Sequence, residues 1–500
     1  MADVLVVGAG VGGLAAAVHL AARGLEVEVL EASGRPGGKL GVRVVDGVEV
    51  DTGPSVLTLP DALDRALRAA GTSLADELTL REPRPSFRYL YADGAAVDVY
   101  PRPEETLASV ERALGPAAAA EMEAFLAYAR RVWEAAAPHF VFGPAPSPAS
   151  LAALGPAALL ALARIDPLRR MWGAIRSRVR SPHLRMLLAR YATYNGSDPR
   201  RAPATLSCIA HVELGLGGYG VEGGMYGVAR ALVRAAERLD VRVHYGARVE
   251  RLAERSGGGW EVSTSDGRTR AARAVVANAD AAHVLADLLP PARRRRATGA
   301  LSMSGWTGVL RARRRAGEGA RVAHTVLFPR DYLEEFADVF DRDRPPAGPT
   351  VYLCAQEACH GRAGWPGHEP VFAMANAPAE PAGRPRDPAE WDGLRERVLA
   401  RLDAAGLRDP DDALVWERTP AGLAAEFPGS RGAIYGAASN SPLAAFRRPA
   451  NRITGVPGVY LASGSAHPGG GVPLCILSGE AAARALLDDL GDSSTRRRAV

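Results

Sequence analysis

Three glycines near the amino terminus constrain the fold of this chain more than any other feature. Gly8, Gly10 and Gly13 keep the spacing G-x-G-x-x-G, directly after the apolar run Val4–Val7 and directly before an alanine-rich stretch. At such a strand-to-helix junction, the first glycine permits a tight turn, the second admits a phosphate group, and the third lets the helix pack on the strand. The N-terminus of the helix also attracts the negative charge of a phosphate. The motif therefore predicts a dinucleotide site at the start of a doubly wound α/β sheet.

An acidic residue after the next predicted strand narrows the choice of dinucleotide. Glu31 follows the strand predicted at Leu25–Leu30, at the distance where a carboxylate accepts hydrogen bonds from an adenosine ribose. The charge of Glu31 would repel a 2′-phosphate. This residue therefore argues against NADP.

The residues that follow Glu31 favour FAD over NAD. A second glycine-rich block, GRPGGK at 34–39, is followed by DTGP at 51–54. A flavin dinucleotide has an extended body that runs past the first turn and is held by later segments, whereas a nicotinamide dinucleotide needs no such continuation. We therefore expect these two blocks to supply further contacts to FAD, from Arg35, Gly38, Lys39 and Gly53.

The composition is that of a globular protein. The chain has 500 residues, of which 47% are hydrophobic and 23% charged, and this length is sufficient for two or three domains. The cysteines form neither a C-x-x-C pair nor a zinc-binding spacing. We expect no metal site and four buried thiols, at Cys208, Cys354, Cys359 and Cys475.

The sequence predicts neither a signal peptide nor a membrane-spanning helix. The chain enters a predicted strand directly after Met1. The longest nearly uncharged stretch, Leu151–Ala163, has about half the length that a bilayer requires and is interrupted by Gly155-Pro156. A cytoplasmic protein is predicted, with association at a membrane surface left open.

The order of the predicted elements indicates a discontinuous nucleotide domain. Strand and glycine patterns at both ends of the chain enclose a region rich in alanine and arginine and a second set of strands. We assign residues 1–90, 221–290 and 421–490 to an FAD-binding domain, 91–220 to a helical, partly membrane-associating substrate region, and 291–420 to the sheet and helices of a substrate domain. The polar and basic residues 491–500 are predicted to form a disordered tail.

Further blocks give the chain a specific resemblance. It is similar, along its whole length and in the same order, to the bacterial-type carotenoid desaturases, which include phytoene desaturase and hydroxycarotenoid 3,4-desaturases. The blocks that carry the resemblance are RYATYNGSDP at 190–199, APAT at 202–205, EGGM at 222–225, GSRGAIYG at 429–436, FRRPAN at 446–451 and SGSAHPGGGVP at 463–473.

The resemblance implies an α/β fold of the glutathione-reductase and amine-oxidase type, in which a Rossmann-like FAD-binding domain carries an inserted α+β substrate domain. It also implies FAD held without a covalent bond and a long apolar channel. On the matching positions, Gly464 and Ser465 would face the pyrophosphate from the other side, and the backbone of Val472 and Pro473 would lie against the flavin ring. Many relatives have arginine at the position of Lys39 and an acidic residue near Ser465, so the contacts at these two positions stay open.

The activity that the resemblance implies is the FAD-dependent desaturation of an acyclic carotenoid in carotenoid biosynthesis. A hydride passes to flavin N5 and a vicinal proton is lost, so the protein mainly has to hold the polyene against the ring. His467 is a candidate proton acceptor, with a loop histidine bonded to backbone as the alternative. His211 and Glu213 are a weaker candidate pair, because a surface or domain contact would explain them equally well. The substrate stays open between phytoene and a later, hydroxylated intermediate.

The segment from residue 151 to 190 combines arginines with apolar side chains. Such a surface suits an anionic membrane and would give a water-insoluble carotenoid a route into the protein, whereas a solvated helix face is the alternative. No nucleic acid partner is expected, because no recognition module accompanies the charges. Oxygen and a membrane quinone are both open as electron acceptors. In the segment from residue 151 to 190, the arginines are Arg164, Arg169, Arg170, Arg176, Arg178, Arg180, Arg185 and Arg190, and the apolar side chains between them include Leu168, Met171, Trp172, Ile175 and Val179.

Three other functions remain open on the sequence alone. A carotenoid cis-trans isomerase would use FAD without net electron transfer, and the mass of its product would equal that of its substrate. An amine oxidase of the same fold would need a polar amine pocket. An inactive flavin-binding scaffold would have no evident need to keep both glycine-rich ends intact.

Overall fold

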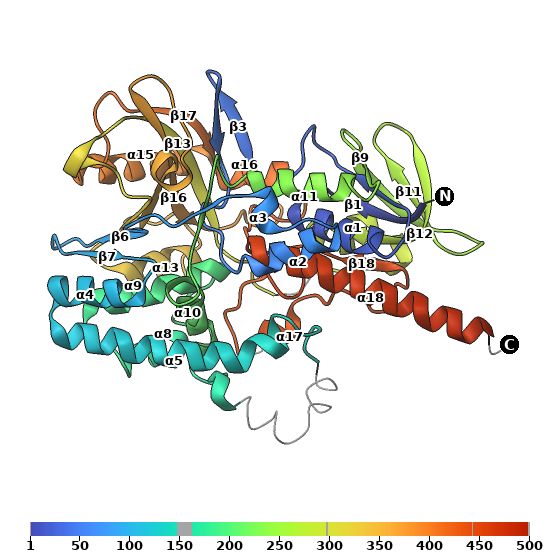
Figure 1. Cartoon of the computed structure of the whole chain (residues 1–500), viewed down its shortest axis with the longest axis horizontal. Helices are drawn as coiled ribbons and strands as arrows, with labels where there is room; N and C mark the ends of the chain where they lie inside the picture. Colours follow the sequence, from blue (N-terminus) through green and yellow to red (C-terminus); the bar gives the residue numbers. More distant parts are fainter. Residues whose placement is uncertain (1, 148–162, 297–298, 443, 499–500) are drawn as a thin grey trace.

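The computed structural model describes residues 2–147, 163–296, 299–442 and 444–498. These residues form two lobes, each built around one seven-stranded sheet (Figure 1). The amino-terminal strand and the carboxyl-terminal helix belong to the same lobe, on the right of Figure 1.

The first sheet is the parallel sheet that the amino-terminal motif predicts. Its order is β10-β11-β12-β1-β2-β9, and β18 also pairs with β12. The strands β9, β2, β1, β12 and β18 run parallel, whereas β10 and β11 form an antiparallel extension. The strands are β1 (Ala2–Val7), β2 (Val27–Leu30), β9 (Arg242–His244), β10 (Val249–Glu254), β11 (Trp260–Thr264), β12 (Thr269–Ala277) and β18 (Val459–Leu461).

Helices from both ends of the chain pack together on this sheet. The helix α1 (Val11–Ala21) is buried on nearly every side, which explains its run of small and apolar residues. It contacts α2 (Asp61–Ala69), α11 (Gly227–Glu237) and α18 (Val472–Arg498). A Cβ atom on Gly479 of α18 would lie 2.2 Å from the carbonyl oxygen of Gly12 in α1. Glycine at position 479 therefore allows these two helices to touch.

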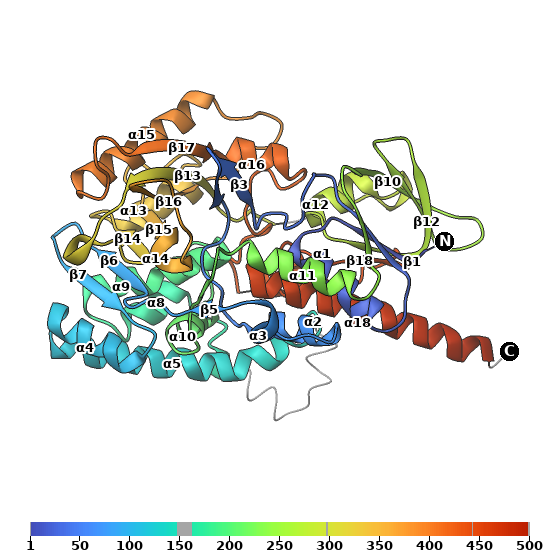
Figure 2. The ribbon, with the colours of Figure 1, turned by 45° about the horizontal axis from the view of Figure 1, so that its top comes forward.

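The second sheet is mostly antiparallel and has the order β17-β13-β16-β15-β14-β6-β7, with β14 and β6 parallel. The helix α15 (Pro388–Ala404) covers one face of it (Figure 2) with the buried side chains of Trp391, Leu394, Val398 and Leu402. The strands are β6 (Phe87–Leu90), β7 (Ala96–Val99), β13 (Ser304–Arg313), β14 (His324–Leu327), β15 (Val351–Ala355), β16 (His368–Ala377) and β17 (Ala413–Arg418).

A layer of helices covers the other face of the second sheet. Alternate residues of β6 and β14, such as Phe87 and Val326, point into the hydrophobic core that this layer shares with the sheet. The layer consists of α4 (Pro103–Leu114), α5 (Pro116–Phe140), α8 (Met171–Arg176), α9 (Pro182–Ala189), α10 (Cys208–Leu214) and α13 (Tyr332–Phe340). The remaining short elements are β3 (Val42–Val45), β4 (Val48–Asp51), β5 (Leu80–Arg81), β8 (Gly220–Val221), α3 (Leu74–Glu77), α12 (Ala281–His283), α14 (Gln356–His360), α16 (Pro420–Glu426) and α17 (Ala444–Arg447).

Two details of the predicted organisation differ from the structure. The strand β6, which lies within the predicted nucleotide domain, pairs with β7 and β14 of the second sheet. The helix α18 continues through Arg498, where the sequence predicts a disordered tail from residue 491.

Candidate functional site

A cavity of about 940 Å³ lies at the carboxyl ends of β1, β2 and β12, the edge at which parallel α/β sheets bind nucleotides. The structure brings ten of the predicted cofactor residues together around it. They are Gly8, Gly10, Glu31, Arg35, Gly38, Lys39, Gly53, Gly464, Ser465 and Val472. The other two lie close by, because Gly13 supports the loop from within α1 and Pro473 lines an adjoining cavity.

The loop from β1 into α1 leaves backbone N–H groups available for an anion. No side chain caps α1, so the N–H groups of its first turn have no partner within the helix. Gly8 has a φ of +95°, and a Cβ atom there would lie 2.7 Å from the carbonyl oxygen of Asn278. A Cβ atom on Gly13 would lie 2.2 Å from the carbonyl oxygen of Gly8. This loop therefore requires glycine, and the N-terminus that it exposes suits a pyrophosphate.

The side chain of Glu31 fastens this loop to the end of β2. Its buried carboxylate accepts hydrogen bonds from the N–H groups of Ala9, at 2.7 Å, and Ser33, at 2.8 Å. Each carboxylate oxygen has a second lone pair. The same group can therefore accept a further hydrogen bond from a ribose hydroxyl.

The second glycine block runs along the cavity beside the first. The N–H of Gly37 donates to the carbonyl oxygen of Ala9 at 2.8 Å. The Nη1 of Arg35 donates to the carbonyl oxygen of Val42 at 2.6 Å. These bonds hold the two glycine-rich segments against each other as one wall.

The ammonium group of Lys39 joins this wall to the carboxyl-terminal half of the chain. Its Nζ donates to the carbonyl oxygens of Ala433, at 3.0 Å, and Ile434, at 2.9 Å. Burial lowers the pKa of Lys39. A Cβ atom on Gly53 would lie 2.5 Å from the carbonyl oxygen of Lys39, so glycine is needed at position 53, where the chain passes close to the backbone of Lys39.

The carboxyl-terminal block forms the opposite wall. The Oγ of Ser465 accepts a hydrogen bond from the N–H of Ala281 at 2.8 Å. Gly464 lies so close to Gly470 that a Cβ atom on the former would be 3.2 Å from the Cα of the latter. Directly after this loop, α18 begins at Val472. The cavity is thus bounded by the N-termini of two helices, which both favour negative charge.

A second cavity of about 640 Å³ adjoins the first. Its walls are mostly apolar and come from the helical layer and the second sheet. The two cavities share lining residues that include Met374, Tyr435, Gly471 and Val472. Leu168, which is 84% exposed, also lines the second cavity. An apolar tunnel therefore leads from the surface to the wall where α18 begins.

The structure gives His467 a backbone partner. Its side chain is buried, lines the second cavity, and places Nε2 3.0 Å from the carbonyl oxygen of Gly143. Burial lowers the pKa of His467, so its imidazole is neutral at neutral pH. The hydrogen bond fits the backbone-bonded alternative, and a catalytic role for His467 stays a prediction.

The structure separates His211 from Glu213, although both belong to α10. Glu213 is buried and accepts hydrogen bonds from the hydroxyls of Tyr191, at 2.8 Å, and Tyr194. Burial and the charge of Arg130 on α5 lower the pKa of His211. Residues two apart on a helix point to different sides, so the side chains of His211 and Glu213 lie in different environments.

Part of the apolar side of the arginine-rich segment packs into the protein core, so these side chains cannot face a membrane. Met171, Ile175 and Val179 are fully buried in the core of the helical layer. A spacing of four residues produces one apolar side of the chain, and this side packs inward. Arg190 is also buried, whereas Leu168 is exposed. Residues 151–162 of the predicted face lie outside the described part of the chain.

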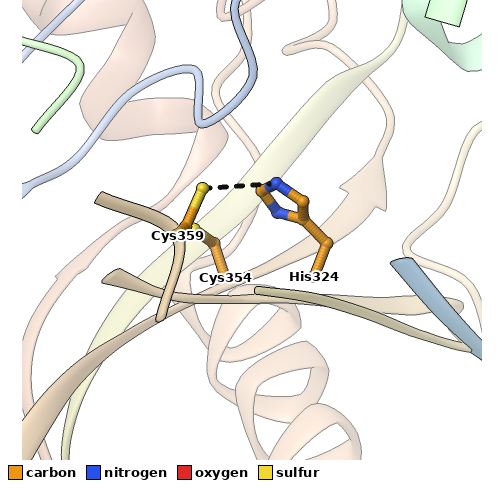
Figure 3. A group of neighbouring side chains, drawn as sticks. All are labelled: His324, Cys354 and Cys359. Carbon is orange, nitrogen blue, oxygen red and sulfur yellow. Dashed lines mark hydrogen bonds between the residues drawn. The ribbon is translucent and has the colours of Figure 1, made fainter. Parts of the chain in front are cut away.

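Three side chains with metal-ligating atoms meet in the core, although the sequence predicts no metal site. The ligand atoms of His324, Cys354 and Cys359 all lie within 4.8 Å of one another (Figure 3). The Nε2 of His324 is 3.4 Å from the Sγ of Cys359, and its Nδ1 is 2.8 Å from the hydroxyl of Tyr352. These ligand types suit a cation such as zinc. Without a metal ion, His324 is a hydrogen-bond partner for the thiol of Cys359, and His360 for that of Cys354. The pairing of β14 with β15 sets His324 opposite Cys354, which no spacing along the chain reveals.

A buried acid behind the second cavity is also absent from the predicted residues. Glu335 on α13 accepts hydrogen bonds from the N–H of Thr350, at 3.1 Å, and from the side-chain amide of Asn376, at 2.8 Å. Thr350 and Asn376 both line the cavity. Burial raises the pKa of Glu335 to about 7. Nothing in the sequence distinguishes Glu335 from its exposed neighbour Glu334 on the same helix.

Comparison with known proteins relates the chain to flavoenzymes. A family model described as flavin containing amine oxidoreductase matches residues 11–312. The hydroxyneurosporene desaturase of Rubrivivax gelatinosus is 36% identical over 512 residues, which cover 99% of this chain and 95% of that protein. The zeta-carotene-forming phytoene desaturase of Myxococcus xanthus is 30% identical over 493 residues, which cover 95% of this chain and 92% of that protein.

Among solved structures, cyclohexylamine oxidase from Brevibacterium oxydans IH-35A has a TM-score of 0.62 at 18% identity, covering 98% of this chain and 99% of its own. Wild-type putrescine oxidase bound to putrescine has a TM-score of 0.59 at 16% identity, covering 97% and 99%. These likenesses confirm the predicted fold class, a Rossmann-like α/β domain of the amine-oxidase type with an inserted α+β domain.

Proposed function

The chain belongs to the flavin containing amine oxidoreductase family, among the bacterial-type carotenoid desaturases, and on this premise we propose that it desaturates an acyclic carotenoid. FAD is the cofactor of this oxidoreductase. We call the first cavity, which glycine-rich loops from both ends of the chain line, the nucleotide cavity. The observation that carries the proposal is the apolar second cavity, which meets the nucleotide cavity at Gly471 and Val472. A long polyene could enter this cavity and reach the wall where α18 begins.

The residues of the first cavity fit FAD, and we assign its parts accordingly. The N-terminus of α1, with Gly8 and Gly10, would hold the pyrophosphate, and Glu31 would accept from the ribose. The flavin ring would lie by the backbone of Val472, next to Pro473. The remaining walls would come from Arg35, Gly38, Lys39, Gly53, Gly464 and Ser465.

When bound, FAD supplies the acceptor for the hydride that leaves the polyene. The chain itself has to orient the polyene, exclude water and take up a proton. The N-terminus of α18 favours negative charge at the shared wall. We propose His467 as the proton acceptor, because it lines the cavity and donation from Nε2 to Gly143 corresponds to the tautomer in which Nδ1 carries a lone pair.

Product mass is the direct test of the proposed reaction. The protein would be expressed in cells that accumulate different acyclic carotenoids, and the extracted pigments measured by mass and absorption spectra. We expect products that are lighter by two hydrogens per new double bond and absorb at longer wavelength. A product of unchanged mass would contradict desaturation and indicate a cis-trans isomerase.

The amine oxidase and scaffold alternatives have their own readouts. The mostly apolar wall of the second cavity does not favour a small amine as substrate. Turnover of simple amines with release of peroxide would nevertheless support that activity. Anaerobic mixing with polyenes that never bleaches the flavin absorbance would support an inactive scaffold. Parallel assays with oxygen and with a quinone would identify the electron acceptor.

We further propose that the protein binds a membrane peripherally at the mouth of the second cavity. Within the described residues, no helix is both long and apolar enough to cross a bilayer. Leu168 and Phe446 are exposed, line the cavity, and are each followed by an exposed arginine. This arrangement would insert apolar side chains and place positive charges at anionic headgroups.

Vesicle flotation tests this surface. The wild-type protein is expected to float with vesicles of anionic phosphatidylglycerol at low salt, and the double variant Leu168→Glu with Phe446→Glu to remain mostly in the soluble fraction. Val44→Glu is the matched control, because Val44 is 65% exposed on β3 and lines only the nucleotide cavity. If wild-type protein fails to float, or the control variant loses flotation equally, this surface is wrong.

A further inference from the structure

The second cavity has a polar corner in its mostly apolar wall. Arg190, Tyr194 and Tyr332 line the cavity there. Arg190 is 8% exposed and Tyr332 is 3% exposed. Burial removes such groups from the hydrogen bonds of water, which is unfavourable unless something replaces them. A cavity for a pure hydrocarbon gains nothing from these side chains.

Arg190 is a buried cation without a carboxylate in direct contact among the described residues. Its hydrogen bonds run from Nη1 to the hydroxyls of Tyr89 and Tyr194, both at 3.2 Å. The carboxylate of Glu213 connects to it only through the Tyr194 hydroxyl. Aromatic ring centroids 5.1 to 5.8 Å away add cation–π attraction. In the described part of the chain, Nε and Nη2 have no partner and remain available to an acceptor in the cavity.

The hydroxyl of Tyr332 has no hydrogen-bond partner in the part of the chain that the structure describes. Its ring is fixed by edge-on contacts with Phe328 and Phe336, at centroid distances of 4.9 and 5.0 Å. Burial raises the pKa of Tyr332 well above its ordinary value, and the positive charge of Arg190 opposes that rise. Phe328 also stacks on the ring of Tyr89 at 6.0 Å, and the Tyr89 hydroxyl accepts from Arg190, so a short chain of contacts joins the two groups at the wall of one cavity.

This corner lies toward the junction of the two cavities. The guanidinium of Arg190 is 5.8 Å from the ring centroid of Tyr352. Tyr352 on β15 pairs directly with Met374 on β16, and Met374 lines both cavities. A group bound at Arg190 is therefore near the part of the tunnel that adjoins the nucleotide site.

We propose that Arg190 and Tyr332 form a subsite for a hydroxyl group of the substrate, so that the enzyme acts on a hydroxylated acyclic carotenoid in preference to the hydrocarbon. This inference rests on the proposed desaturase function and specifies its substrate class. The hydroxyl oxygen of the substrate accepts a hydrogen bond from the guanidinium of Arg190, and a second hydrogen bond joins the substrate hydroxyl to the hydroxyl of Tyr332. A hydrocarbon would leave the Tyr332 hydroxyl unpaired and would give Arg190 no acceptor beyond its two tyrosines. Sites of this kind discriminate strongly against analogues that lack the hydroxyl.

The test uses neurosporene and hydroxyneurosporene, which differ by the elements of water. Binding to the oxidised, FAD-loaded enzyme is measured from the spectral shift of the polyene, and turnover from product mass. We expect the wild-type protein to prefer hydroxyneurosporene by about 100-fold or more. Tyr332→Phe is expected to reduce this preference about 10-fold, and Arg190→Met to abolish it. In both variants, the loss should fall on the hydroxylated polyene.

Tyr352→Phe is the matched control for the aromatic wall. Its hydroxyl is engaged by the Nδ1 of His324 at 2.8 Å, so its removal should affect both polyenes alike and leave their ratio unchanged. Bound flavin and the melting temperature of each variant are recorded, because Arg190→Met also removes two hydrogen bonds to tyrosines. Tyr332→Phe removes no bond within the described structure and keeps the test decisive.

The possible outcomes separate this subsite from the proposed function. Equal binding of both polyenes by wild-type protein, or an unchanged ratio in Tyr332→Phe, overturns the subsite even if desaturation is observed. Preferential binding of hydroxyneurosporene without loss of two hydrogens supports the subsite and overturns the desaturase assignment.

Discussion

A Gly8→Val variant is expected to purify almost free of flavin. Gly8 has a φ of +95° and lines the nucleotide cavity, and a β-branched residue is a genuine outlier in that backbone region. The added Cβ atom would also lie 2.7 Å from the carbonyl oxygen of Asn278, which is main chain and cannot rotate away. Together these effects should cost about 3 kcal/mol or more of cofactor binding, or roughly a 100-fold loss of affinity.

The ratio of flavin absorbance to protein absorbance measures this loss, and titration with added FAD gives the affinity. Gly34→Val is the matched control in the same wall. A Cβ atom on Gly34 meets nothing within 4 Å, and its φ lies outside the left-handed region. The control should retain FAD. A Gly8→Val protein with full flavin content would contradict the assignment of this loop to the pyrophosphate.

A Gly479→Val variant is expected to lose about 3 kcal/mol or more of folding free energy, a large part of the total for a typical protein. Its Cβ atom would lie 2.2 Å from the carbonyl oxygen of Gly12 and 2.9 Å from the backbone nitrogen of Ala16. Both contacts are main chain of α1, so the two helices would have to separate. The site would then lose the support of α18 behind the nucleotide loop.

Thermal unfolding and soluble yield measure this effect, with Gly491→Ala as the control in the same helix. A Cβ atom on Gly491 meets nothing within 4 Å. Alanine there should stabilise the helix by about 0.5 to 1 kcal/mol, because it lowers the entropy of the unfolded chain. Equal melting temperatures for Gly479→Val and the wild-type protein would show that this contact is not part of the native packing.

Local patterns were sufficient to predict the dinucleotide end of the molecule. The strand, the turn glycines and the following helix are adjacent in sequence, so their geometry follows from spacing and backbone freedom alone. The matching blocks at 429–436 and 463–473 extended the prediction to the opposite wall, and the fold class and FAD are confirmed. Lys39 illustrates the limit of local patterns. The sequence predicts that it lies at the cofactor, but its hydrogen bonds to Ala433 and Ile434 join residues that no local rule connects.

Other features depend on long-range pairing or on the direction in which a face points. The apolar spacing of Met171, Ile175 and Val179 is the same for a face in a membrane and a face in a protein core, and the helical layer buries it. Arg190 appeared as one arginine among several, but its burial among tyrosines depends on strands and helices from distant parts of the chain. Sequence pattern shows that a side chain can be buried, not which neighbours it meets.

The pairing of β18 with β12, and the contact of α18 with α1, have a consequence for biosynthesis. The ribosome releases β1 and α1 about 450 residues before β18, an interval on the order of a minute. Throughout that interval the nascent Rossmann unit lacks an edge strand and the helix that covers Gly12. Stable retention of FAD is therefore expected to require β18 and α18, and a chain that stops before residue 459 is expected to purify without the cofactor.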